Sequence, residues 1–129
     1  MVLAMIQVSD EVFERMIADA IDSLPDRFLD HAKNVAIVWD HDPTPQQRME
    51  MKLRPYESLY GLYQGIPLTR RGDGYNLVLP DKITIFKNPI LHSADSIEAA
   101  QKQVLHTLWH EIAHHYGLDH DRIHELEDS

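Results

Sequence analysis

Apolar residues recur at helical spacing near both ends of the chain. Between residues 12 and 24 they follow one another in threes and fours, behind a candidate cap at Ser9 and two acids that suit a first helical turn. Pro25 should end this helix. A second stripe follows Ser93 and Ser96, either of which can cap it; its members are Ile97, Ala100, Val104, Leu108 and Ile112. The pattern therefore predicts one helix before and one helix after the middle of the chain.

The middle of the chain has the patterns of strands. Residues 34–39 are an apolar, β-branched run that is typical of a buried strand. Residues 59–68 combine strand-forming side chains with glycines and predict a bent or bulged strand, and residues 82–90 alternate apolar with polar side chains and predict a half-buried one. Residues 40–58 contain three prolines and predict a long loop with one helical turn. The order helix, strands, helix indicates an α+β domain with a small mixed sheet.

Length and composition limit the class of protein. The 129 residues fit one domain, residues 1–129, which is long enough to bury a core. There is no apolar run of roughly 20 residues that could span a membrane, and the N-terminus has no basic region of the kind found in signal peptides. The absence of cysteine excludes disulfides and thiolate ligands. We expect a cytoplasmic protein without a membrane partner.

Charge and histidine content point away from nucleic acid and towards a metal. The formal net charge is −9, whereas proteins that bind nucleic acid usually present a basic face to the phosphates. The chain has nine histidines, and four of them fall between residues 110 and 120. Composition alone would seldom produce such a cluster.

The clustered histidines form the motif HEIAHHYGLDH over residues 110–120, which reads H-E-x-x-H-x-x-G-x-x-H. Residues four apart on a helix lie on one face, so His110 and His114 can bind one zinc ion. Gly117 permits a positive φ and a sharp turn, which lets His120 return as the third ligand. Three neutral histidines leave a fourth position open for water, which is typical of a catalytic zinc site.

Glu111 lies between the first two predicted ligands in the sequence but points in a different direction. It can take a proton from the zinc-bound water and pass that proton to a leaving amine. Asp119 and Asp121 are candidate acceptors for the second N–H of a ligating histidine. The other histidines are weaker candidates for the metal site. We expect His106 to be packed, His115 to be an outer contact of the site or a surface residue, and the rest to lie on the surface: His31, His41, His92 and His124.

The motif matches the extended zinc signature of the metzincin metallopeptidases. Metzincins follow it with a methionine-containing turn, whereas all five methionines of this chain precede it, so we expect a smaller domain. Most of the chain more closely resembles the small bacterial zincin-like proteins, which are minimal metallopeptidase-like domains. The likeness includes residues 59–68, residues 80–86 and the motif as far as Asp119.

This resemblance implies a zincin-like fold with a small sheet packed on the active-site helix. It also implies a zinc-dependent metallopeptidase whose partner is a peptide or protein substrate. Family members often carry an acid at the third ligand position, where this chain has His120. An extended peptide could add as a further strand beside residues 82–90, and a loop covering that edge is the alternative.

Two other functions remain open from the sequence. Bacterial rRNA-maturation endonucleases carry H-G-x-x-H-x-x-G-x-D-H, which this chain matches except that Glu111 replaces the glycine. A water-activating glutamate favours amide hydrolysis, and the acidic charge disfavours RNA. The third possibility is a zinc-binding interaction domain without catalytic activity.

Overall fold

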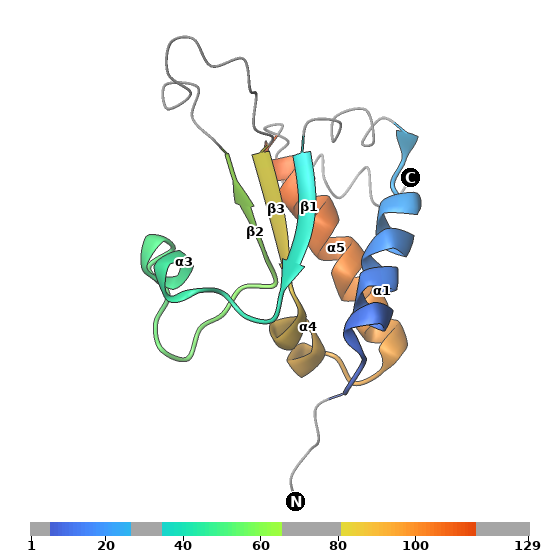
Figure 1. The fold of residues 1–129 in the computed structure, drawn as a ribbon, viewed down its shortest axis with the longest axis horizontal. Coiled ribbons are helices and arrows are strands. Elements are labelled where there is room, and N and C mark those ends of the chain that lie inside the picture. The colour runs from blue at the N-terminus through green and yellow to red at the C-terminus, as the bar shows by residue number, and fades with distance from the viewer. Residues whose placement is uncertain (1–5, 27–34, 66–80, 116–129) are drawn as a thin grey trace, which may run out of the picture.

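A computed structural model of the chain describes residues 6–26, 35–65 and 81–115. In chain order, its elements are α1 (Asp10–Asp22), β1 (Val35–Asp40), α3 (Pro45–Glu50), β2 (Gly61–Gln64), β3 (Asp81–Phe86), α4 (Lys87–Ser93) and α5 (Ile97–His115). The three strands form one sheet, α5 lies behind it, α1 lies to the right of β1, and α4 lies at the lower end of the sheet (Figure 1). The predicted α+β class is confirmed.

The two long helices begin where local hydrogen bonding favours it. The Ser9 hydroxyl accepts a hydrogen bond from the Val12 amide at 3.1 Å, with acids in the first turn of α1. Ser96 does the same for α5, accepting from the Ala99 amide at 3.0 Å. Ser96 is therefore the cap of the last helix, because Ser93 belongs to α4 and donates its hydroxyl to the Ile90 carbonyl.

The sheet is mixed and has the strand order β1-β3-β2. β1 runs parallel to β3, and β2 runs antiparallel to β3. The prediction that residues 82–90 form a sheet edge is wrong, because β3 is the central strand and pairs on both sides. The strand also ends earlier, at Phe86, where the chain enters α4. Among the strands of the described residues, β1 and β2 are the two at the edges of this sheet.

The hydrophobic core lies between the sheet and the two long helices. Ile83 and Ile85 of β3 are fully buried and pack against the apolar sides of α1 and α5. The predicted stripe of α5 is buried from Ala100 to Ile112, but Ile97 is 58% exposed. Ile97 is the first residue of α5, so it precedes the part of the helix that meets the core.

The predicted loop at residues 40–58 contains the short helix α3. Thr44 and Gln47 form a capping box, in which each side chain accepts a hydrogen bond from the other residue's backbone amide. Pro45 stands in the first turn, where its missing N–H costs nothing. α3 buries no residue, so capping rather than core packing defines it.

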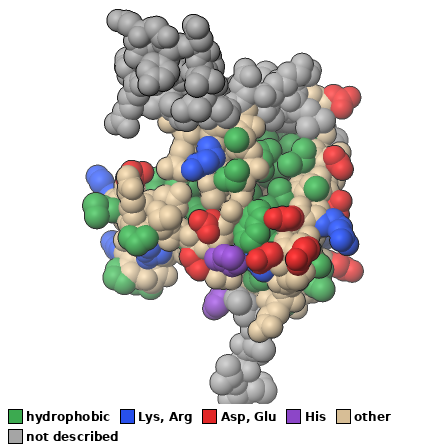
Figure 2. Space-filling view, viewed as in Figure 1, with side chains coloured by type: hydrophobic (Ala, Val, Ile, Leu, Met, Phe, Trp, Pro, Cys, Tyr) green, Lys and Arg blue, Asp and Glu red, His purple; other side chains and the backbone are tan. Residues whose placement is uncertain are grey.

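The exposed face is acidic along α1. Acidic side chains lie along the right-hand side of the molecule in Figure 2, where α1 lies. In the described residues, we find no helix that is both long and apolar enough to cross a membrane.

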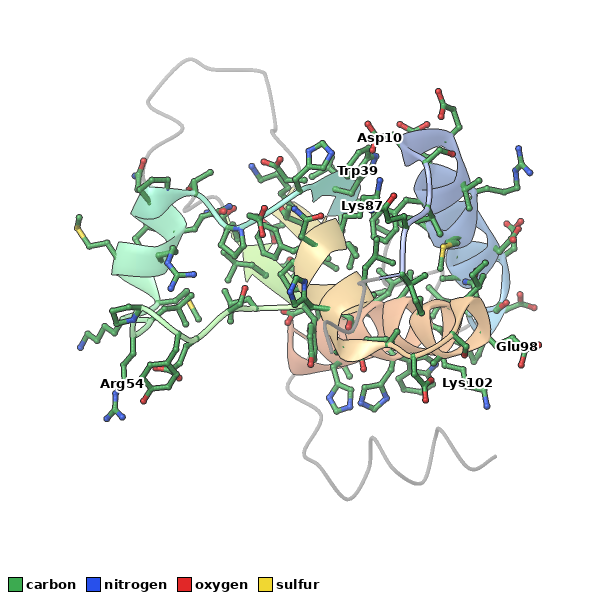
Figure 3. The ribbon with its side chains drawn as sticks, turned by 90° about the horizontal axis from the view of Figure 1, so that it is seen from below. Asp10, Trp39, Arg54, Lys87, Glu98 and Lys102 are labelled. Carbon is green, nitrogen blue, oxygen red and sulfur yellow. The ribbon has the colours of Figure 1, made fainter. Side chains whose placement is uncertain are left out.

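A buried lysine joins α1, β1 and α4. The Nζ atom of Lys87 donates to Asp10 Oδ1 at 2.8 Å and lies 5.9 Å from the centre of the Trp39 ring. The Lys87 side chain is only 9% exposed, whereas that of Asp10 is 52% exposed. Figure 3 shows these three labelled residues together where the elements meet. His41 adds a second contact to Asp10 at 3.3 Å.

The hydrogen bond from Lys87 is the main cause of a lowered pKa at Asp10, and His41 lowers it further. A carboxyl group whose pKa is lowered by folding stabilises the fold above its ordinary pKa, 3.8 here. That contribution is lost as the pH falls through the lower, folded-state pKa. We expect Asp10→Asn to lower the melting temperature at neutral pH and to flatten its decline between about pH 5 and pH 2.

The measurement is a series of thermal melts across this pH range. Glu11→Gln is the matched control, because it removes one carboxylate from the same helical turn. Parallel acid declines in the Asp10→Asn variant and the wild type would show that the Lys87 contact contributes no pH-dependent stability.

Candidate active-site cleft

The buried side of α5 fixes the position of the motif residues. Leu108, Ile112 and Ala113 are at most 1% exposed and hold this part of the helix against the core. His110 and Glu111 lie between them in the sequence and are partly buried. Core packing therefore presents these two residues at the margin of the helix, where it meets β2.

A cleft of about 310 Å³ lies at that margin. One wall is residues 58–61, which lead into β2, and the other is α5. The helix contributes Gln103, His106, Thr107, His110 and Glu111 to the lining. An imidazole and a carboxylate that the sequence predicted to act together thus line the same cleft.

The cleft depends on a close approach of β2 to α5 at Gly61. A Cβ atom at this position would lie 2.6 Å from Thr107 Cγ2 and 3.3 Å from the Thr84 carbonyl oxygen. It would also lie 3.6 Å from Glu111 Cγ. The strand can pass this near the helix only because Gly61 has no side chain. Gly61 thereby brings the backbone of an edge strand next to Glu111.

The hydrogen bonding of β2 sets which backbone groups face outwards. The Phe86 amide donates to the Tyr60 carbonyl at 2.9 Å, and Gly61 is the next residue, opposite Ile85. In an antiparallel ladder, residue pairs that are hydrogen-bonded to each other alternate with pairs that are not. Tyr60 and Phe86 form a bonded pair, so the next residue, Gly61, directs its N–H and C=O away from β3. The outer edge of β2 therefore presents backbone donors and acceptors beside Glu111.

His106 differs from its prediction. We expected a packed histidine, but the residue is exposed and lines the cleft. Its ring lies against that of His110, with centroids 4.2 Å apart and planes inclined by 56°. The two residues are one helical turn apart, so the same spacing that aligns metal ligands also places this imidazole beside that of His110. The predictions for His41 and His92 are confirmed, because both are exposed.

The other residues of the predicted site lie outside the part of the chain that the structure describes. His114 belongs to α5, one turn after His110, but its side chain is outside the described part, as is that of His115. The segment from residue 116 onwards, with Gly117, Asp119, His120, Asp121 and His124, is also outside it, and so is His31. Among the side chains that the structure describes, which do not include those of His114 and His115, no three histidine or acidic residues are grouped so as to hold an ion.

The strand side of the cleft was not predicted from the sequence. The glycines of residues 59–68 predicted a bend or bulge, and residues 82–90 were the predicted substrate edge. A glycine within a strand also marks a close approach of another chain segment. The glycine at position 61 could therefore have predicted that another segment packs closely against this strand. It could not have predicted which helix that segment belongs to.

Comparisons with known proteins agree with this architecture. Residues 32–129 match the family described as zincin-like metallopeptidase. The fold is similar to the solved structure of a conserved hypothetical protein from Thermus thermophilus, with a TM-score of 0.58 and 20% sequence identity. That match covers 84% of this chain and 94% of the other. No curated protein matches the sequence at a significant level.

The contact at Gly61 can be tested by substitution. We expect Gly61→Ala to destabilise the fold by about 1–3 kcal/mol, because its Cβ would overlap Thr107 Cγ2 in a packed region. Adding Thr107→Ser should recover most of this loss, since it removes Cγ2 but keeps the hydroxyl that accepts from Gln103 at 3.0 Å. Urea unfolding of the single and double variants measures the coupling.

Gly65→Ala is the matched control, because its nearest neighbour would be an ordinary 3.7 Å away. We expect a change within about 0.5 kcal/mol at that site. Equal stability of the Gly61→Ala variant and the wild type would mean that β2 and α5 are not in the described contact.

Proposed function

The chain belongs to the zincin-like metallopeptidase family, and from this premise we propose that it is a zinc-dependent hydrolase of peptide bonds. The observation that supports the proposal most strongly is the cleft between β2 and α5. It combines the carboxylate of Glu111, the imidazole of His110 and the outward-facing backbone of Gly61. These are the groups that amide hydrolysis needs at one place: a base, a metal ligand and a strand edge that can align a peptide.

The proposed zinc ligands are His110, His114 and His120. His110 fits this role because its ring lines the cleft beside Glu111. His114 follows by one turn of the same helix, the spacing at which two imidazoles can bind one ion. When bound, zinc supplies a Lewis acid that polarises a carbonyl group and makes water more acidic.

Glu111 is the proposed general base. Its carboxylate accepts a proton from the water that attacks the carbonyl carbon of the peptide bond. As the C–N bond breaks, the same carboxyl group returns the proton to the leaving nitrogen. Glu111 lines the cleft, and its Cγ would lie 3.6 Å from a Cβ atom at Gly61, so its side chain is next to the proposed path of an extended substrate.

The proposed substrate edge is β2, in place of the predicted edge at residues 82–90. β3 is flanked by β1 and β2 and cannot accept another strand. A peptide added to the outer side of β2 would hydrogen-bond the Gly61 backbone and lie alongside Glu111. The lining of the cleft contains no lysine or arginine among the described residues, which favours peptide over an RNA backbone.

We expect Glu111→Gln to lower peptide cleavage by at least about a hundredfold while zinc stays bound, because the amide cannot act as a base. The measurement pairs turnover of a diverse peptide library with elemental analysis of the purified protein. His114→Ala is the companion variant and should lose the metal as well as the activity. The two variants therefore separate proton transfer from metal binding.

Wild-type rates in the Glu111→Gln variant, after contamination has been excluded, would contradict the role of Glu111. One zinc per chain in the His114→Ala variant would contradict the ligand set. RNA cleavage that persists through purification and requires His120 would replace the peptidase proposal with the endonuclease alternative.

A further inference from the structure

A second and larger cavity adjoins the active-site cleft. It has a volume of about 580 Å³, a size that suits a side chain or small ligand. Ser58 and Tyr60 line both this cavity and the cleft beside Glu111. The remaining lining comes from Asp42, after β1, from Tyr56, and from α4. The two hollows are therefore neighbours on either side of the segment that leads into β2.

Asp42 is the acidic residue among the described residues that line the cavity, and His92 of α4 also lines it. Asp42 Oδ2 accepts a hydrogen bond from the side-chain Nδ2 of Asn88 at 2.7 Å. The backbone N–H of Asn88 donates to the His41 carbonyl at 2.9 Å. These bonds tie Asp42 to the start of α4 and hold its carboxylate at the cavity. In Figure 2, acidic and histidine side chains adjoin at the lower centre of the face, the region of α4 in Figure 1.

Two exposed aromatic rings complete the polar wall. Tyr56 is 78% exposed and Tyr60 is 42% exposed. These are large exposed fractions for aromatic side chains, which folding usually buries to a greater extent. The faces of aromatic rings attract cations, and a neighbouring carboxylate strengthens that preference. A cavity with one carboxylate and two phenol rings has the chemistry to receive an ammonium or guanidinium group.

The nearby arginine does not fill this role. Arg54 Nη1 donates to the Tyr56 hydroxyl at 2.9 Å, and its Nε lies 3.9 Å from Glu57. Its labelled side chain extends away from the body of the molecule in Figure 3. Arg54 therefore lies beside Glu57, and Asp42 is the acidic residue in the lining of the cavity.

The distance from the cleft suits an extended peptide. Residues 58 and 61 are three positions apart, so at most about 10 Å of chain separates them. Ser58 and Tyr60 precede β2, so a peptide paired with β2 at Gly61 would reach them with a side chain within about three residues of the bond beside Glu111. One of its side chains would then enter the second cavity.

We propose that this cavity, lined by Asp42, Tyr56 and Tyr60, is a specificity subsite for an arginine or lysine side chain of the substrate. The subsite rests on the proposed peptidase function and names its substrate class: peptides with a basic residue within about three positions of the cleaved bond. The net charge of −9 acts in the same direction, because it attracts basic peptides over a longer range.

The test measures peptide binding separately from cleavage. The zinc-loaded full chain carrying Glu111→Gln is titrated with synthetic peptides of one common sequence, in which arginine, lysine, glutamine or glutamate is placed at each position in turn. We expect one position at which a basic residue tightens binding. Adding Asp42→Asn should weaken binding of that peptide about three- to fivefold and leave the glutamine peptide unchanged.

Asp42→Asn is suited to this test because its amide oxygen can still accept the hydrogen bond from Asn88. Asp19→Asn is the matched control, since it removes one charge from an exposed position on α1. Binding without a preference for basic residues, or a preference that persists in the Asp42→Asn variant, would overturn the subsite.

Cleavage by the chain without Glu111→Gln distinguishes the two proposals. Basic peptides that bind through Asp42 but are not cleaved would support the subsite and refute hydrolysis. Peptides that are cleaved without regard to basic residues would support hydrolysis and refute the subsite.

Discussion

The close approach of β2 to α5 at Gly61 is the constraint on which the candidate site depends. A strand edge and a helix can share a cleft only if their backbones come close, and here a single Cβ atom would prevent it. Thr107 fills the space beside Gly61, and Glu111 follows Thr107 by one helical turn on the same side. The contact therefore links a packing requirement to the position of the proposed base.

The rest of the fold holds this contact in place. β3 lies between the edge strands and supplies the isoleucines against which α1 and α5 pack. At the lower end of the sheet, the buried Lys87 joins α4 to α1 and β1 through Asp10 and Trp39. The proposed substrate subsite lies at this same end, where Asn88 of α4 holds Asp42. The core thus orients α5, and α4 shapes the neighbouring cavity.

The sequence predicted those features that arise from local patterns. The two helices, the cap at Ser9 and the α+β class follow from spacing and hydrogen-bonding preferences within a few residues, whereas the choice between Ser93 and Ser96 as the second cap needed the structure. The order of the strands could not be predicted from the sequence. The alternation of apolar and polar side chains in residues 82–90 indicates that one face of the strand is buried, but it does not indicate which strands lie beside it. Gly61 and the cleft depend on contacts between segments more than 40 positions apart, which no local pattern contains.

The central claim is that an extended peptide lies along β2 beside the metal ligands of α5. A crystal structure of the zinc-loaded Glu111→Gln chain with a bound peptide tests it most directly. We expect zinc to be bound by His110, His114 and His120 and the peptide to be hydrogen-bonded to the Gly61 backbone. A peptide bound along β1, or a zinc ion without His110 among its ligands, would contradict it.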